Sequence, residues 1–384
     1  MATIIVSGAI ANKYLHGGEA RVRLNWALGL RRLGHRVSFV EQISRAACVD
    51  ENGAVTDFGR CVNRQWFEQI IRQFGLSGAA ALIYEEGEQT CGLSYEEISG
   101  IAGGCDLLIN ISGHLSLKPL LRRIRRKAYI DIDPGFTQFW HNQSDTAFRV
   151  DGHDFYFTIG ENIGTPGCII PTADIHWRHT RPPVVLEHWP LATQGVSDKF
   201  TTIASWRGPY GSIEFEGKLF GLKLHEFRKF IELPRKARGI FEIALNIHPA
   251  EENDLRLLHD NWQLVDPARV ARDPLSFRNY VQNSGAEFSV AQGVYVDTAS
   301  GWFSDRTVGY LASGKPVLVQ DTGFSRNYPC GEGLVAFGTL DQAIAGAERI
   351  MNDYERHSQA PRAVAEAYFD SDKVLAKLLE EINL

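Results

Sequence analysis

The chain has 384 residues, of which 44% are hydrophobic and 22% are charged. This composition is ordinary for a soluble globular protein, and the length exceeds that of a typical single domain, so two domains are expected. The formal net charge of −6 argues against a protein whose whole surface attracts nucleic acid.

The cysteines and the apolar runs indicate the cellular compartment of the protein. The six cysteines are scattered and form no C-x-x-C pair, which favours reduced thiols over zinc ligands or disulfides. The apolar start at Thr3–Gly8 is too short for a signal peptide, and no run is long enough to span a bilayer. We therefore expect a cytoplasmic protein.

The first half alternates short apolar runs with amphipathic segments, which is typical of a parallel sheet wrapped by helices. One amphipathic segment carries Val22, Trp26, Leu30 and Leu33 on one face and is expected to end at Gly34. A shorter helix is expected near Leu117–Arg126. The predicted strands are Ile4–Val6, Val37–Val40, Asp106–Ile111, Ala128–Ile132, Phe155–Thr158 and Cys168–Ile170.

Polar and glycine-containing loops follow three of these runs: His16–Gly18, Ser112–His114 and Asp133–Gly135. Each lies just beyond the carboxyl end of a predicted strand. Open α/β sheets bind ligands at that edge, so these loops are candidate site segments.

Arg181–Pro190 resembles a linker, after which a second α/β series begins. Tyr210–Arg238 is aromatic and basic and receives no firm assignment, whereas Ala360–Leu384 is expected to be a helix with leucines and Ile382 on one side. Two similar halves predict a cleft between them, where ligand sites are common. The predicted strands of this half are Thr201–Ala204, Phe241–Leu245, Ala286–Val290 and Pro316–Val319.

The stretch from Ser300 to Asp321 reads as a polar loop, a short helix and a buried strand. Ser304, Arg306 and Thr307 stand where the helix would begin. A helix start offers unpaired N–H groups and a partial positive charge to a phosphate, and arginine adds a planar fork of donors. An ordinary αβ connection explains the same residues about equally well.

Several segments resemble glycosyltransferases of the GT-B fold, in which two Rossmann-like domains face each other across a cleft that holds a nucleotide-sugar. The resemblance spans nearly the whole chain, although each motif is short. It is carried by His16–Glu19, Leu33–Val37, Asp106–His114, Val265–Phe288, Ser300–Gly323 and Gly331–Val335.

The resemblance implies an α/β protein with an acceptor-binding domain over 1–185 and a nucleotide-sugar-binding domain over 190–358. The segment 360–384 would be a C-terminal helix that packs back on the first domain. One departure stands out: retaining members of the superfamily carry two glutamates two turns apart where this chain has Gly301 and Gly309. The ribose contact must then come from elsewhere, and neither stereochemical class follows.

The resemblance places the donor diphosphate on Ser304, Arg306 and Thr307, with Arg207 opposite them. Lys218 or Lys223 could be the lysine companion, although a solvated lysine is the favoured alternative. The full set of predicted donor contacts is Gly17, Gly18, Arg207, Asp266, Val270, Ser304, Asp305, Arg306, Thr307, Asp321, Thr322 and Gly323.

Two residues are candidates for the chemistry on the acceptor side. His114 follows a strand and titrates near neutrality, although a structural histidine is about as plausible. Asp133 is a candidate base or imidazole partner, or else a turn former. Glu19 more plausibly caps a helix. Phe136 and Trp140 could form an acceptor platform, although core packing is the commoner role of aromatic residues.

The leading hypothesis is a glycosyltransferase that moves a hexose from UDP or another nucleoside diphosphate without a metal ion or further cofactor, since no metal-ligand spacing is evident. A nucleotide-sugar epimerase and a catalytically silent sugar-nucleotide-binding protein are the alternatives. The acceptor is open, with a small molecule, glycan or lipid-linked sugar favoured over nucleic acid. Arg122–Lys127 is a solvated helix face or a site for an anionic acceptor, and a homodimer is kept as an expectation.

Overall fold

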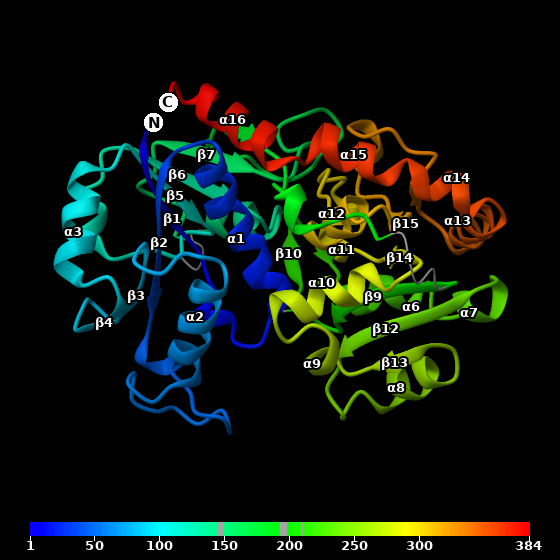
Figure 1. The fold of residues 1–384 in the computed structure, drawn as a ribbon. Helices are drawn as coiled ribbons and strands as arrows, with labels where there is room; N and C mark the ends of the chain where they lie inside the picture. Colours follow the sequence, from blue (N-terminus) through cyan, green and yellow to red (C-terminus); the bar gives the residue numbers. More distant parts are fainter. Residues whose placement is uncertain (144–148, 193–197, 209) are drawn as a thin grey trace.

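The computed structural model describes residues 1–143, 149–192, 198–208 and 210–384. The chain forms two α/β halves, each built on its own mostly parallel sheet, which lie next to each other (Figure 1). A two-stranded hairpin is the third sheet of the described residues. Neither half contains, within its described residues, a helix long and apolar enough to cross a membrane.

The first sheet has eight strands in the order β4-β3-β2-β1-β5-β6-β7-β8, and all pair in parallel except β3 with β4. Its central strands are buried on both faces, as the continuous apolar runs predicted. The strands are β1 (Thr3–Ser7), β2 (Arg36–Ile43), β3 (Ala80–Tyr84), β4 (Gln89–Gly92), β5 (Leu107–Ile111), β6 (Lys127–Asp131), β7 (Phe155–Thr158) and β8 (Trp177–His179).

The predicted strand at Cys168–Ile170 is wrong. These residues have no regular secondary structure, and the edge strand β8 comes later in the chain. The apolar character of the segment has another cause, because Ile170 is 4% exposed and packs in an aromatic cluster. A short apolar run therefore marked burial here but not a strand.

The helices of the first half cover both faces of its sheet. The long helix after β1 ends as predicted, with Gly34 in a left-handed conformation at φ 84°. The helix expected near Leu117–Arg126 is a single turn, because Ile124 instead turns into the core. The helices are α1 (Gly17–Arg32), α2 (Val62–Gln73), α3 (Tyr95–Gly104), α4 (Lys118–Leu121) and α5 (Phe136–Asn142), with 3₁₀ turns η1 (Ala11–Lys13) and η2 (Arg45–Ala47).

The second sheet has six parallel strands in the order β13-β12-β9-β14-β15-β16. The four predicted strands of this half are confirmed, whereas the two edge strands were not predicted. The strands are β9 (Lys199–Ser205), β12 (Ile240–Asn246), β13 (Gln263–Val265), β14 (Ala286–Ser289), β15 (Val317–Gln320) and β16 (Leu334–Phe337). The helices up to residue 359 are α6 (Lys223–Arg228), α7 (Leu233–Lys236), α8 (Glu252–His259), α9 (Pro267–Val270), α10 (Pro274–Gln282), α11 (Gly293–Asp297), α12 (Asp305–Ala312), α13 (Leu340–Asn352) and α14 (Tyr354–Gln359), with 3₁₀ turns η3 (Leu186–His188) and η4 (Phe324–Arg326).

The unassigned stretch after β9 contains the hairpin of β10 (Ile213–Phe215) and β11 (Lys218–Phe220). The hairpin packs on α5 of the first half. The ring of Phe139 lies 5.2 Å from that of Phe220 in a stacked arrangement and 4.8 Å from that of Phe215. This shared aromatic core joins the two halves on one side of the cleft.

The tail is two helices rather than one: α15 (Pro361–Tyr368) and α16 (Ser371–Glu381). The break follows from Phe369, which is fully buried among the rings of Phe303 and Tyr328. In Figure 1 α15 lies over the second half and α16 returns to the first, near both termini. The leucines of α16 join the core of the first sheet. The domain limits near residues 185 and 358 stay a prediction.

The chain crosses between the halves twice at one place. Val184 lies in the outgoing segment and donates its N–H to the carbonyl of Phe369 at 2.8 Å. The N–H of Ser371 in turn donates to the carbonyl of Val184 at 2.9 Å. The outgoing and returning segments are therefore paired like two short strands.

Candidate functional site

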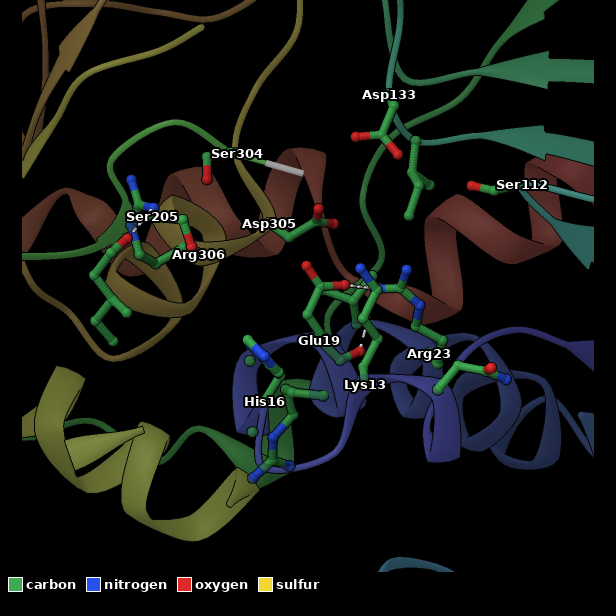
Figure 2. A pocket seen from close by; sticks show the side chains of 18 of the residues that line it. Lys13, His16, Glu19, Arg23, Ser112, Asp133, Ser205, Ser304, Asp305 and Arg306 are labelled. Carbon is green, nitrogen blue, oxygen red and sulfur yellow. Dashed lines mark hydrogen bonds and ion pairs between the residues drawn. The ribbon is translucent and has the colours of Figure 1, made fainter. Parts of the chain in front are cut away.

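A cavity of about 1010 Å³ lies between the two halves. The loops that line it follow the carboxyl ends of β1, β5 and β6 in the first sheet and of β9, β12 and β13 in the second. This is the edge at which open α/β sheets bind ligands, so the predicted position of the site agrees with the structure. Figure 2 shows the side chains that converge there.

The glycine pair at the start of α1 lines the cavity, but its closest neighbour is protein. A Cβ on Gly17 would lie 2.2 Å from the backbone carbonyl of Asp273, and one on Gly18 would lie 3.3 Å from the ring of Phe277. The N–H of Gly17 donates to the carbonyl of Ala271 at 2.9 Å. The glycines were predicted to allow a ligand to approach the backbone closely. In the structure they allow the close approach of α10 from the other half.

A buried carboxylate shapes the loop before α1. The side chain of Glu41, fully buried on β2, accepts the N–H groups of Ile10, Ala11 and Asn12, each at 2.8 Å. Three donors on one carboxylate fix the turn η1. Lys13 follows directly and extends into the cavity toward the carboxylates (Figure 2).

Glu19 forms an ion pair with Arg23 one turn later on α1. Burial opposes ionisation of the carboxyl, but the charges of Arg23 and Lys13 outweigh it and lower the pKa of Glu19 to about 2. Arg23 is 4% exposed, and its charge also interacts with Asp133 and Asp305. Glu19, predicted as a cap, is thus part of a charged cluster, and the Glu19–Arg23 spacing of four residues was the signal that sequence reasoning missed.

Asp133 extends into the cavity from the loop after β6 (Figure 2). Burial, together with the charges of Glu19 and Asp131, raises the pKa of Asp133 to about 6. Its carboxylate lies 3.4 Å from the hydroxyls of Tyr210 and Tyr295. A carboxyl group that titrates near neutrality and is reached from the cavity suits a general base.

A second buried acid holds the loop of Asp133. Asp131 is fully buried and accepts hydrogen bonds from Thr137, Gln138 and Thr158 at 2.7–2.8 Å. It also accepts the N–H of Asp133 at 3.1 Å. The backbone that presents Asp133 is therefore fixed before any ligand binds.

Asp305, the first residue of α12, faces Asp133 from the other half (Figure 2). Burial raises the pKa of Asp305 to about 7; Arg23 lowers it, whereas Glu19 and Asp133 raise it further. Three carboxylates from two halves thus surround one arginine. Because a carboxylate repels phosphate, Asp305 itself is better placed to contact hydroxyl groups than the diphosphate predicted for it.

His114 lines the cavity after β5, as predicted. Burial and the charges of Arg23 and Lys13 lower the pKa of His114 to about 3. The imidazole is therefore neutral at physiological pH. It can donate or accept one hydrogen bond, but it does not supply a positive charge to a ligand.

Ser304 and Arg306 line the cavity at the start of α12, whereas Thr307 is fully buried outside it. Arg306 does not present a free fork of donors. Its Nε donates to Glu287 at 2.7 Å, its Nη1 to the carbonyl of Ile203 at 2.8 Å and its Nη2 to Ser289 at 2.7 Å. Because Glu287 is fully buried, Arg306 is first of all its counter-ion.

Lys223 supplies the free positive charge that Arg306 lacks. It lines the cavity at the start of α6, and burial, together with the charge of Arg306, lowers its pKa to about 7. No ion pair joins its ammonium to a carboxylate in the part of the chain that the structure describes. The other candidate, Lys218, lies on the hairpin over the ring of Phe220, outside the cavity.

Three further predicted donor contacts, Arg207, Asp266 and Val270, lie in different surroundings. Arg207 is exposed and paired with Glu251 at 2.5 Å. Asp266 lines the cavity and caps α9 through the N–H of Ala268, whereas Val270 packs in the core beside it. The structure thus brings only Asp266 of these to the cavity.

The turn after β15 also lies outside the cavity lining. Asp321 accepts the N–H of Gly323 at 2.8 Å and so closes a local turn, and Thr322 is buried. Asn162 of the first half donates to the carbonyl of Gly323 at 3.1 Å. These residues join the halves rather than facing a ligand.

The predicted aromatic platform is divided. Trp140 lines the cavity, but Phe136 is 1% exposed and packs against Tyr210 with ring centroids 4.8 Å apart. Tyr210 and Tyr295 line the cavity as well and were not predicted. Core packing therefore accounts for Phe136, and the aromatic wall includes Trp140, these two tyrosines and Trp302, which stacks on Tyr295.

Neighbouring side chains fill the space next to the two glycines that stand at the expected glutamate positions. A Cβ on Gly309 would lie 2.8 Å from the indole of Trp189, and one on Gly301, at φ 75°, would lie 2.8 Å from Asn162. A glutamate at position 309 would collide with the tryptophan. No set of three or more His, Cys, Asp or Glu side chains over the described ranges is arranged to hold a metal ion.

Comparison with known proteins places this geometry in a fold. Neither a protein-family model nor a curated protein matches the sequence. Among solved structures, an alpha-glucosyltransferase in complex with UDP has a TM-score of 0.59 at 12% identity, and Anabaena Alr3699/HepE in complex with UDP-glucose has a TM-score of 0.62 at 10% identity. Both alignments cover 100% of each chain. A Listeria monocytogenes protein described as a UDP-N-acetylglucosamine 2-epimerase has a TM-score of 0.52 at 13% identity, over 100% of this chain and 97% of the other.

The two facing Rossmann-like halves and these likenesses show that the chain has the GT-B fold. The resemblance predicted from short motifs is confirmed at the level of the fold. The roles of the individual site residues stay predictions.

Proposed function

We propose that this protein is a glycosyltransferase that takes a sugar from a nucleoside diphosphate donor bound in the cavity between the halves. The observation that carries the proposal is Lys223, a half-buried ammonium that forms no ion pair with a carboxylate among the described residues and shares the charge of Glu287 with Arg306. An anionic group would supply the missing counter-charge. The UDP and UDP-glucose in the similar structures are ligands of that chemistry.

The departing diphosphate would be stabilised by a protonated lysine and by fixed dipoles. Lys223 supplies the charge, and the start of α12 at Ser304 supplies unpaired N–H groups. Asp266, which lines the cavity from the same half, would face the nucleoside. This assignment replaces Arg207 and the guanidinium of Arg306 as the direct phosphate contacts.

The acceptor would enter on the opposite side, beside Asp133, Trp140 and His114. Asp133 would accept the proton of the acceptor hydroxyl, since its pKa is raised to about 6 by burial and by the charges of Glu19 and Asp131. His114, neutral in the cavity, would hold a hydroxyl group. No step requires a metal ion, and metal independence is part of the proposal.

An epimerase of the same fold is the second candidate, since a protein described as such an enzyme is among the similar structures. The epimerase needs no acceptor. Conversion of a nucleotide-sugar in the absence of any acceptor would favour this candidate over transfer.

The test is to incubate the purified chain with a panel of nucleotide-sugars, with and without EDTA, and to measure binding, donor hydrolysis and transfer to sugar acceptors. We expect a nucleoside diphosphate to bind and donor consumption to survive EDTA. Absence of binding to every member of the panel would overturn the proposal. Tight binding without consumption would instead indicate a silent binding protein.

A further inference from the structure

Two arginines of α1 are buried two residues apart, and they differ in their partners. Arg23 is 4% exposed and has Glu19 as its counter-ion. Arg21 is 3% exposed, and neither a salt bridge nor a hydrogen bond joins it to a carboxylate within the described ranges. Burial, with the charge of Arg278, lowers the pKa of Arg21 to about 10. A buried cation without a counter-ion is costly, so the site calls for an explanation.

The surroundings of Arg21 leave only its in-plane donors for a further partner. The guanidinium lies 5.0 Å from the ring centroid of Phe74 and 5.5 Å from that of Trp189. One donor, Nη2, reaches the carbonyl of Pro274 at 3.1 Å, and the buried Nε has no partner. Aromatic contacts offset part of the cost of burial, but a guanidinium stacked in this way binds its anions along the free edge.

A second arginine approaches from the other half. Arg278 stands one helical turn after Pro274 on α10, so both residues share the face that meets α1. Its Nη1 donates to the carbonyl of His188 at 3.3 Å, and its Nε is likewise buried without a partner. No carboxylate pairs with Arg278 over the described ranges either.

The cavity reaches the Arg21 side of this junction, whereas Arg278 is not among its lining residues. Arg21 and Trp189 line it together with Asn25 and Phe277. The indole N–H of Trp189 is buried and has no hydrogen-bond partner. Several donors without acceptors therefore meet where α1, α10 and the crossing segment touch.

We propose that a phosphate-type anion binds at this junction, between Arg21 of the first half and Arg278 of the second, and bridges the two halves. Planar guanidinium groups bind phosphoryl oxygens through paired N–H donors, and a dianion would neutralise both. The site is separate from Lys223 and does not rest on the proposed sugar transfer. The anion is either free phosphate or a phosphoryl group on a ligand in the cavity.

The experiment compares thermal unfolding of the full chain with and without inorganic phosphate, in the wild type and in Arg21→Met and Arg278→Met. Arg36→Met, an exposed arginine at the start of β2, is the matched control. We expect phosphate to raise the Tm of the wild type and of the control by about 2 °C or more. Each junction variant should bind phosphate about tenfold or more weakly, as measured by calorimetry.

The sign of the stability change separates an anion site from a merely structural arginine. Without phosphate, Arg21→Met removes an uncompensated buried charge and should be as stable as the wild type or more so. With phosphate, it should be less stable than the wild type. A variant that is destabilised equally in both buffers would overturn the proposal, as would a wild type that phosphate does not stabilise.

Adding UDP identifies the source of the anion. If the increases in Tm caused by phosphate and by UDP are additive, the anion is free phosphate at a separate site. Competition between the two, lost in Arg21→Met, indicates that the junction receives a phosphoryl group of the cavity ligand. Competition that Arg21→Met leaves unchanged would place the phosphate at Lys223 and would overturn the proposal.

Discussion

The two ends of the cavity carry opposite charges that are balanced in different ways. At one end, Glu19, Asp133 and Asp305 surround Arg23, and two of these acids have a pKa raised toward neutrality. At the other end, Lys223 stands beside an arginine that is already neutralised by Glu287, and its pKa is lowered. The acidic end suits hydroxyl groups and proton transfer, and the basic end suits an anion. Under the proposed function, the donor phosphates would therefore lie at one end of the cavity and the acceptor at the other.

The largest expected effect tests the acidic end. Asp133→Asn removes the proposed base and should lower the rate of transfer by about 10²–10⁴-fold, with binding of the nucleoside diphosphate unchanged. Asp321→Asn is the control, since Asp321 lies outside the cavity lining. The readout is kcat for transfer at saturating donor. Equal losses in the two variants would remove Asp133 from the chemistry.

The next largest expected effect concerns the Arg306–Glu287 ion pair beside Lys223. Arg306→Met leaves the fully buried Glu287 without its counter-ion and should lower the free energy of unfolding by about 3–5 kcal/mol. Arg207→Met, which loses only an exposed contact with Glu251, should cost less than about 1 kcal/mol. Denaturant unfolding measures both. A stable Arg306→Met with weak diphosphate binding would instead restore Arg306 as the main phosphate ligand.

Lys223→Met tests the anion itself. The variant should weaken binding of a nucleoside diphosphate by about 1–3 kcal/mol, and Lys218→Met on the hairpin should leave binding as it is. Because the pKa of Lys223 is lowered to about 7, wild-type affinity should be highest below pH 7 and should fall as the pH rises above it. Calorimetry across this range checks both points. An affinity that does not change with pH in the wild type would contradict the role of the ammonium.

The smallest expected effect concerns Asp305 and pH. Its pKa is raised from the ordinary 3.8 to about 7, so between these values the folded state binds more protons than the unfolded state. The Asp305 contribution therefore lowers stability as the pH rises through this window. Asp305→Asn should be more stable than the wild type at pH 8, by about 1 kcal/mol, and should lose that advantage toward pH 4. Urea unfolding at several pH values measures the difference in the free energy of unfolding. A stability advantage of Asp305→Asn that grows toward low pH would contradict the raised pKa of Asp305.

Sequence reasoning located most of the strands that are buried on both faces, but it missed the fully buried β3 as well as the edge strands β4, β8, β13 and β16. The interior strands β1, β5 and β15 read as mostly apolar runs because helices cover both faces of the sheets. The short edge strands β4 and β13 are half-exposed, so their sequences give no comparable signal. Cys168–Ile170 shows the converse error, since an irregular segment is apolar where it covers an aromatic cluster.

The position of the site in the fold could be predicted from the sequence, but the residues that form it could be predicted only in part. Asp133, His114 and Ser304 follow strand ends or begin a helix, so topology alone brings them to one edge. Lys223 could not be chosen over Lys218 because the hairpin after β9 has no counterpart in the motifs used. Arg306 was misjudged because its partner Glu287 lies on another element, between Ala286 and Phe288 of a buried strand.

The paired crossing at Val184 and Phe369 constrains how the cleft can widen. Since both passages of the chain between the halves are hydrogen-bonded to each other, they form one strap rather than two separate tethers. Rotation about this strap keeps both hydrogen bonds, whereas pulling the halves straight apart breaks them. Arg362 reinforces this strap, since its Nη1 donates to the carbonyl of Trp189 at 2.7 Å.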